Sequence, residues 1–332
     1  MRAGFVSRAA FGLLLLLLLG TIGWGVLAGP AGIGVGEALA ALAPGAGPSL
    51  ARDILWEIRV PRVAGAVMAG AGLGISGALF QALLRNPLAE PYLLGVSSGA
   101  AFGAVGAITL GIGAGPWGLS LAALGGGLLA VGIVFRVARA ASRLDTRVLI
   151  LAGVVVASFF GASVMLLLTF TSGGAFRSAV LWTMGSLAGM SWGKVGALGA
   201  YVVPASLLAY GMARHLNALA LGEEAAAHVG TEVERVKRAA YFLASALAAA
   251  AVSVAGVIGF VGLVIPHAVR LVWGTDHRQL LPLSFLGGAA FLTASDTAAR
   301  TLASPVEIPV GVVTAFVGVP FFLVLLRRSH AG

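Results

Sequence analysis

The residues of this chain that could do chemistry are few, and their spacing does not form a catalytic or metal site. The histidines, which are His215, His228, His267, His277 and His330, lack the spacing of metal ligands. The carboxylates do not pair within helices as they do in proton relays and di-metal sites. Cysteine is absent, which excludes a thiol nucleophile and a cysteine-based metal site. We therefore expect no enzymatic activity, metal or cofactor in this chain.

Asp296 is the best candidate for a functional charge within an apolar segment, because ionisable groups are rare and unfavourable inside a membrane. Arg300 follows one helical turn later, so a local ion pair between residues i and i+4 is the simpler interpretation.

The sequence also lacks a loop that could hold the phosphates of a nucleotide. Its only Gly-Lys pair, Gly193-Lys194, is followed by Val195 where such a loop needs Ser or Thr, and Ala188 stands where its first glycine would be. Any ATP hydrolysis is therefore expected on another chain.

Composition indicates which solvent surrounds these residues. Of the 332 residues, 59% are hydrophobic and 10% are charged, and the mean hydropathy is +1.01. Too little polar surface remains to cover a soluble globule, so we expect an all-α, multi-pass membrane protein. The net charge of +9 comes from short basic clusters between apolar segments, which argues against a nucleic-acid partner.

About ten segments approach the ~20 residues that a helix needs to cross a bilayer. We place them near residues 9–28, 60–84, 93–112, 117–138, 148–170, 191–213, 236–255, 258–271, 279–300 and 309–327. Glycine pairs four residues apart, Gly70 with Gly74 and Gly99 with Gly103, predict close helix packing. Between the first two spans we expect an outer loop with a short interfacial helix near Val35 to Leu42.

The distribution of positive charge predicts that both termini face the cytoplasm. Most of the 21 lysine and arginine residues fall in loops that this topology places inside. The outer side holds only Arg52, Arg59, Arg62, Arg177, Lys194 and Arg300. As an alternative, the first span is a cleavable signal peptide, because Arg2 and Arg8 precede its apolar run and Val26-x-Ala28 fits a cleavage site. The charge bias disfavours the shifted topology that would result.

Two proline-containing stretches interrupt the apolar pattern. Asn86 to Pro91 follows the second span, and Gly262 to His267 lies within the short eighth span. Non-helical backbone at membrane depth is tolerated only where protein or a water-filled cavity satisfies it, so such breaks often mark transport pathways. The simpler alternative is a proline kink at Pro266 beside a buried, hydrogen-bonded His267.

The longest polar stretch that this topology places inside runs from residue 214 to residue 238. Within it, helix-forming residues lie between Gly222 and Gly230, and Glu223 and Glu224 occupy the first turn, where the helix dipole favours acids. The stretch is either a solvated connector or a short helix that contacts a partner.

Two blocks of the sequence resemble a known family. The first runs from Arg59 to Gly99, and the second runs from Gly256 to Arg328. The second block contains the signature positions Phe260-Val261-Gly262-Leu263, Pro266-His267, Arg270, Asp276-His277-Arg278, Asp296, Arg300, Glu307-x-Pro309-x-Gly311 and Gly318-x-Pro320-x-Phe322. The chain is similar over essentially its whole length to the permease subunits of type II ATP-binding-cassette (ABC) importers for iron complexes, haem and vitamin B12.

This resemblance implies a single ten-helix permease domain over residues 1–332 and a homodimer around a central path. It also implies two cytoplasmic ATPase subunits that bind ATP and Mg²⁺, a periplasmic substrate-binding protein, and a location in the bacterial inner membrane. The cargo would be a ferric siderophore, haem or vitamin B12.

The resemblance further implies roles for individual residues. The binding protein would dock on Arg59, Arg62 and Arg300. The ATPase would couple to Gly222, Glu223, Glu224 and Gly230. The inner gate would contain Asn86, Leu88 and Thr146. The pathway would be lined by Ser158, Ser163 and Thr169, although these small hydroxyl groups often bond back to their own helix. The family's structural motifs would include Pro87, Pro266, His267, Glu307 and Pro309.

Two other classes of function remain open from the residues alone. An ion-coupled secondary transporter would need ionisable groups near the middle of the membrane, and an integral membrane enzyme would need a paired acid, base or metal constellation. Neither pattern is found in the sequence.

Overall fold

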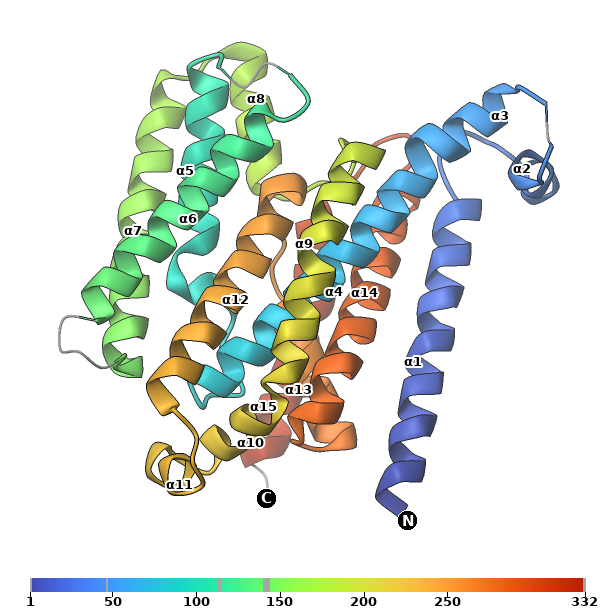
Figure 1. Cartoon of the computed structure of the whole chain (residues 1–332). Helices are drawn as coiled ribbons and strands as arrows, with labels where there is room; N and C mark the ends of the chain where they lie inside the picture. The colour runs from blue at the N-terminus through green and yellow to red at the C-terminus, as the bar shows by residue number, and fades with distance from the viewer. Residues whose placement is uncertain (1, 46, 113–114, 140–143, 331–332) are drawn as a thin grey trace.

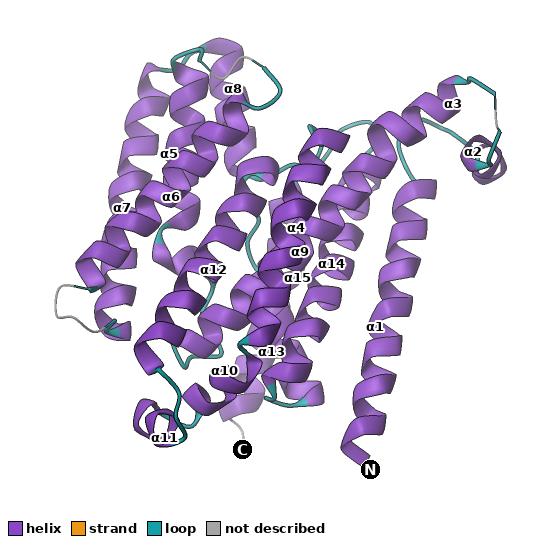
Figure 2. Ribbon diagram, viewed as in Figure 1, coloured by secondary structure: helices purple, strands orange, loops and turns teal. Residues whose placement is uncertain are grey.

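The computed structural model describes residues 2–45, 47–112, 115–139 and 144–330, and every regular element within these ranges is helical (Figure 2). The remaining positions, which include both ends of the expected domain 1–332, lie outside the described residues. The expectation of an all-α fold is confirmed.

The helices follow one another along the chain without an intervening strand in the described ranges. They are α1 (Arg2–Leu27), α2 (Val35–Leu42), α3 (Leu50–Asp53), η1 (Ile54–Arg59), α4 (Val60–Leu83), η2 (Pro91–Leu94), α5 (Val96–Thr109), α6 (Gly118–Ala138), α7 (Thr146–Phe170), α8 (Gly173–Thr183), α9 (Trp192–Gly211), α10 (Ala213–Ala220), α11 (Glu223–His228), α12 (Val233–Ala255), α13 (Val261–Trp273), α14 (His277–Thr301) and α15 (Val310–His330).

Each of the ten expected spans overlaps a helix of the described ranges. Five are long and apolar enough to cross a bilayer alone, namely Arg8–Leu27, Leu50–Leu83, Gly118–Ala138, Thr146–Phe170 and Val233–Ala255. The pair α9 and α10, bent by 55° relative to each other, adds a sixth if the two are counted as one span. Shorter apolar helices occur in α5, α13 and α15, and the 25-residue α14 completes the set. The chain is therefore a multi-pass membrane protein.

Two elements differ from the expected spans. The second span begins at Leu50 and not near residue 60, because α3, η1 and α4 form one continuous helix whose wide π-helical turn covers Ile54–Arg59. A helix also occupies Gly173–Thr183, where an outer loop was expected. The short helix expected near Val35 to Leu42 is confirmed as α2.

The central helix of the bundle is α4, which packs against α9, α12, α13 and α14 (Figure 1). On one side of it α1 lies along α14, and on the other side α5, α6, α7 and α8 pack together and join the centre through α12. Both chain termini lie at the same end of the bundle as α10 and α11 (Figure 1).

Glycines allow α4 to approach its neighbours at backbone distance. A Cβ atom added at Gly70, Gly74 or Gly77 would overlap the carbonyl oxygen of Gly288, Ser284 or Gly262, respectively. The same holds for Gly99 and Gly103 of α5 against α6. The close packing predicted from the glycine spacing is therefore confirmed, and it matters because lipid supplies little hydrophobic force between helices.

We predict that Gly74→Ala weakens the contact between α4 and α14 and destabilises the detergent-solubilised protein by about 1–3 kcal/mol, the usual range for overpacking. The matched control is Gly132→Ala in α6, because a Cβ there meets no atom within 4 Å. Unfolding in an SDS titration measures both variants. Equal stability of the two variants would contradict the packing argument.

Candidate functional site

Five charged residues gather where α4, α14 and the segment before α15 meet, at the end of the bundle opposite the termini (Figure 1). Arg62 donates from Nε to both oxygens of Asp296, at 3.1 and 3.0 Å, and from Nη1 to both oxygens of Glu307, at 3.0 Å each. Arg300 Nε lies 3.6 Å from Asp296 Oδ2. The expected pair between Asp296 and Arg300 is therefore present, but Arg62 of α4 is the closer partner.

The other arginine contacts of this cluster reach the end of α1. Arg59 Nη1 donates to the carbonyl oxygens of Val26 and Leu27 at 3.3 and 3.0 Å, and Arg300 Nη2 donates to the carbonyl of Gly25. The last carbonyls of a helix lack intrahelical partners and carry partial negative charge, which two guanidinium groups satisfy here. The cluster therefore fastens α1 to α4 and α14.

The three arginines expected to dock a binding protein, Arg59, Arg62 and Arg300, are buried in the single chain. Only 3%, 6% and 2% of these residues is exposed, respectively. Their guanidinium groups bond to Asp296, Glu307 and the carbonyls of α1, so almost none of their surface can reach a soluble partner. In this structure the three arginines form a buried charge cluster that joins three helices, and their expected role in docking stays a prediction.

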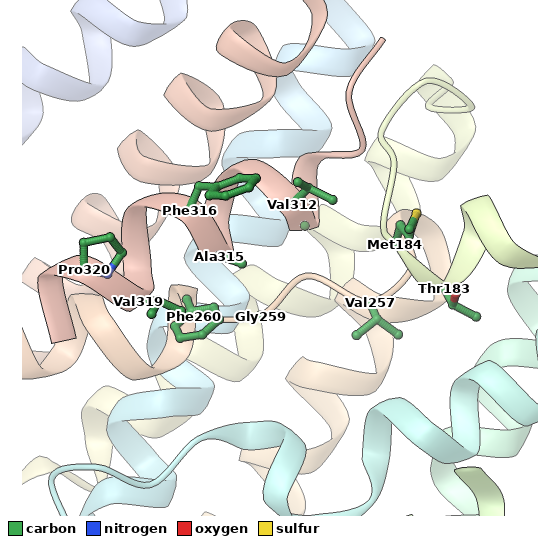
Figure 3. Close-up of a pocket in the computed structure, with 11 residues that line it drawn as sticks. Thr183, Met184, Val257, Gly259, Phe260, Val312, Ala315, Phe316, Val319 and Pro320 are labelled. Carbon is green, nitrogen blue, oxygen red and sulfur yellow. The ribbon is translucent and has the colours of Figure 1, made fainter. Parts of the chain in front are cut away.

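An apolar cavity of about 580 Å³ lies between the end of α8, the segment before α13, and α15 (Figure 3). Its walls include Met184 directly after α8, Val257 and Phe260 from the segment before α13, and Val312, Phe316 and Pro320 from α15. The start of α15 is held there by backbone bonds, because Val310 N–H donates to Gly185 and Gly311 N–H donates to Met184.

The wall of the cavity between α12 and α13 is non-helical, and side chains satisfy its backbone. Glu90 Oε1 accepts from Phe260 N–H at 2.8 Å, which fixes Phe260 in a left-handed conformation with φ +70°. The Tyr92 hydroxyl donates to the Ile258 carbonyl at 2.6 Å and accepts from its N–H at 3.1 Å. Such satisfaction is what permits irregular backbone within a membrane protein.

The helix break predicted at Gly262 to His267 lies instead a few residues earlier in the chain. The structure is helical through Pro266, and the irregular stretch precedes it at residues 256–260. Proline removes the N–H that would bond to Gly262, and Gln81 Nε2 of α4 instead donates to the Gly262 and Leu263 carbonyls at 3.4 and 3.2 Å. The helix can therefore continue.

The turn after α4 is built by its own side chains. Asn86 Oδ1 accepts from Leu88 N–H at 2.9 Å, and the preceding Arg85 has a left-handed φ of +48°. His267 Nδ1 is buried and has no hydrogen-bond partner in the described ranges, unlike the hydrogen-bonded imidazole of the simpler alternative. Thr146 begins α7 after the helix cap Asp145, and no hydrogen bond within the described ranges joins it to the Asn86 turn.

The pathway residues expected on α7 bond to their own helix. Ser158, Ser163 and Thr169 donate to the carbonyls of Val154, Phe159 and Leu166 at 2.9, 2.8 and 2.7 Å. They lie on an exposed, largely apolar face of α7. These hydroxyl groups by themselves do not mark a ligand site.

The stretch expected to couple to an ATPase is a pair of short helices, α10 and α11, at the end of the bundle that carries the termini (Figure 1). Gly222 and Gly230 flank α11 with φ values of +120° and +80°, conformations that favour glycine. Glu223 forms an ion pair with Lys237 at 3.0 Å, and Glu224 is exposed. The helix predicted between the two glycines is therefore confirmed.

A polar junction joins α10 to the start of α14. Asn217 Nδ2 donates to Asp276 Oδ1 at 2.6 Å, and Asn217 Oδ1 accepts from the His277 N–H at 2.8 Å. Burial would raise the pKa of Asp276, but hydrogen bonds from the Arg278 N–H and the Asn217 amide outweigh it and hold the pKa below its usual range. Asp276 therefore caps α14 as a carboxylate.

Sequence reasoning missed Gln81, Glu90, Tyr92 and Lys237, although each satisfies buried polar groups. For Gln81 a signal existed, because a polar amide within an apolar span needs an internal partner.

The fold and these sites define a multi-pass membrane subunit whose apolar cavity is lined by irregular backbone. The chain belongs to the FecCD transport family, which matches residues 13–328. It is therefore the permease subunit of an ABC importer, a transport component whose ATPase is a separate subunit.

Individual proteins agree with this membership. The chain is 48% identical over 284 residues to a cobalamin import system permease protein of Halobacterium salinarum, covering 84% of this chain and 75% of that one. It is 42% identical over 287 residues to a hemin transport system permease protein of Yersinia pestis, covering 84% and 85%. A metal-chelate type ABC transporter solved in an inward-facing conformation superposes with a TM-score of 0.84 at 32% identity, covering 97% of this chain and 99% of that one.

We predict that Arg62→Gln destabilises the solubilised protein by about 3–5 kcal/mol, because it leaves the buried Asp296 without its closest partner. Arg177→Gln, which removes an exposed arginine, should change stability by less than about 0.5 kcal/mol. SDS unfolding curves of both variants provide the measurement. A small effect of Arg62→Gln would show that the cluster does not hold the helices together.

Proposed function

We propose that two copies of this chain form the membrane path of an importer for an iron complex or vitamin B12. In this proposal a periplasmic binding protein delivers the cargo, and two cytoplasmic ATPase subunits bind ATP and Mg²⁺ and drive the transport. The chain lies in the inner, or cytoplasmic, membrane with both termini inside and forms one domain over residues 1–332.

The observation that carries this proposal is the apolar cavity beside α15. Phe316 lines it and is 75% exposed in the single chain, and the neighbouring face of α15 is also apolar. A second copy would cover such a face and enclose the cavity, since large exposed apolar patches mark contact surfaces. A path with few charges suits a bulky cargo that is released without tight binding.

Within this path, the α7 residues Ser158, Ser163 and Thr169 are proposed to face the cargo. The turn with Asn86 and Leu88 is proposed to close the inner end together with Thr146. The names of the similar proteins in Halobacterium salinarum and Yersinia pestis make cobalamin and haem the first cargoes to test, before ferric siderophores.

An ion-coupled mechanism has less support. In the described ranges, Asp296 and its partners lie at one end of the bundle and not at its middle, and each acidic group there is paired. A secondary transporter needs a titratable group that can exchange its ion near the midplane.

We predict that Gly222→Val and Gly230→Val impair coupled transport, because a β-branched residue resists the positive φ that aims α11 at the ATPase. The test is ATP-driven uptake of cyanocobalamin or haem into proteoliposomes that contain the chain with its ATPase and binding protein. The control is Gly132→Val, at a position where an added Cβ meets no atom within 4 Å. Normal uptake by both coupling variants would remove the basis for assigning α11 to the ATPase, and uptake that continues without ATP would contradict the importer mechanism.

We also predict that the start of α8 is periplasmic and α11 is cytoplasmic. Because the chain has no cysteine, single cysteines can be introduced at Ser172 and Ala225, both exposed. A membrane-impermeant maleimide should label Ser172→Cys in intact spheroplasts and Ala225→Cys only after permeabilisation. The reverse pattern would invert the topology.

A further inference from the structure

Lys237 is a buried lysine in the second turn of α12. The residue is 3% exposed, and its ammonium group lies 3.0 Å from Glu223 Oε1 and 3.4 Å from Glu234 Oε1. A buried ammonium group is stable only with such partners, because burial removes the water that would otherwise solvate it. Its two carboxylates belong to different helices, α11 and α12.

The Glu234 carboxylate also binds the backbone just before α7. Glu234 Oε2 accepts from the backbone N–H of Leu144 at 2.9 Å. Leu144 is 1% exposed, and it directly precedes Asp145, the cap of α7. The position of Leu144 therefore sets where α7 begins, at Thr146.

The Glu223 carboxylate belongs to α11. Glu223 is the first residue of that helix and follows Gly222, whose φ of +120° allows the chain to turn there. Three bonds thus lead from α11 through Glu223, Lys237 and Glu234 to the residue before α7. The neighbouring ion pair of Arg235 and Glu232 is an ordinary surface pair. Its charged atoms are 3.6 Å apart, and both side chains are more than 70% exposed.

We infer that Lys237 is a positioning residue that transmits displacement of α11 to the start of α7. The inference rests on the proposed function, in which α11 contacts the ATPase and Thr146 belongs to the inner gate. When α11 shifts, the ammonium group of Lys237 either follows Glu223 or moves fully to Glu234. A buried ammonium group needs a carboxylate partner in both cases. Either movement changes how Glu234 holds the Leu144 N–H. Two discrete arrangements of one buried charge would thus link the two segments.

The test measures the gate directly in the reconstituted complex of this chain with its ATPase and binding protein. A Thr146→Cys chain, otherwise without cysteine, is labelled from the cytoplasmic side by a maleimide, without nucleotide and with ATP and vanadate. We expect the labelling rate to change by at least about fivefold between the two states, the lower end of typical allosteric coupling.

In the Lys237→Met background, the nucleotide-dependent change in labelling rate should fall below about twofold. This substitution removes the ion pairs that connect α11 to Glu234. Lys237→Arg should restore it, because arginine keeps the buried positive charge. The matched control is Lys194→Met, which changes the only other lysine of the chain, on the outer side. It should leave the nucleotide response intact.

Glu223→Gln provides a second variant that keeps one carboxylate beside Lys237 and so preserves folding. It should show the same loss of the nucleotide response in labelling at Thr146→Cys. A response equal to that of the wild type in either Lys237→Met or Glu223→Gln would overturn the inference. Absence of ATPase copurification, or of any nucleotide response, in the wild-type chain would instead overturn the proposed function and this inference with it.

Discussion

The backbone contact of α4 with α13 and α14 is the constraint on which the rest of the structure depends. Because Gly70, Gly74 and Gly77 present no side chains, the carbonyls of Gly288, Ser284 and Gly262 lie directly against them. This approach brings Arg62 of α4 within reach of Asp296 and brings Gln81 within reach of the carbonyls that Pro266 frees. Larger residues at the three glycines would separate these polar partners, and each would then be buried without a bond.

The charge cluster at the end of the bundle opposite the termini explains how polar groups persist in so apolar a chain. Arg62, Asp296 and Glu307 satisfy one another, and the excess positive charge of Arg59 and Arg300 is directed at the carbonyls that end α1. The carbonyls at a helix end and the buried side-chain charges both need polar partners where little water is available. Here each group supplies partners for the other. The first helix is therefore bound to the bundle by electrostatics as well as by packing.

Much of this fold could be predicted from the sequence, because hydropathy, glycine spacing and helix caps are local signals. They predicted a helix in each of the ten expected spans, the short helix α2 and the short helix between Gly222 and Gly230. Long-range pairing could not be predicted in this way. The i+4 spacing indicated only Arg300 as a partner of Asp296, whereas Arg62 lies 234 residues away along the chain. Likewise, the burial of Arg59, Arg62 and Arg300 depends on the position of the end of α1 in the folded bundle. Local sequence patterns do not predict that position.

The two ends of the bundle differ in how they can move. At the end opposite the termini, Asp296, Arg300 and Arg62 are at most 6% exposed, and separating them would leave buried charges unpaired, so α4, α14 and α1 are expected to move there as one body. At the end that carries the termini, α11 lies between two glycines with positive φ and is joined to the bundle through the Glu223 carboxylate, which is 40% exposed. The Glu223 carboxylate is less tightly enclosed than the partners in the charge cluster at the opposite end. Movement of α11 relative to the bundle therefore has its natural hinge at the two glycine turns that flank it.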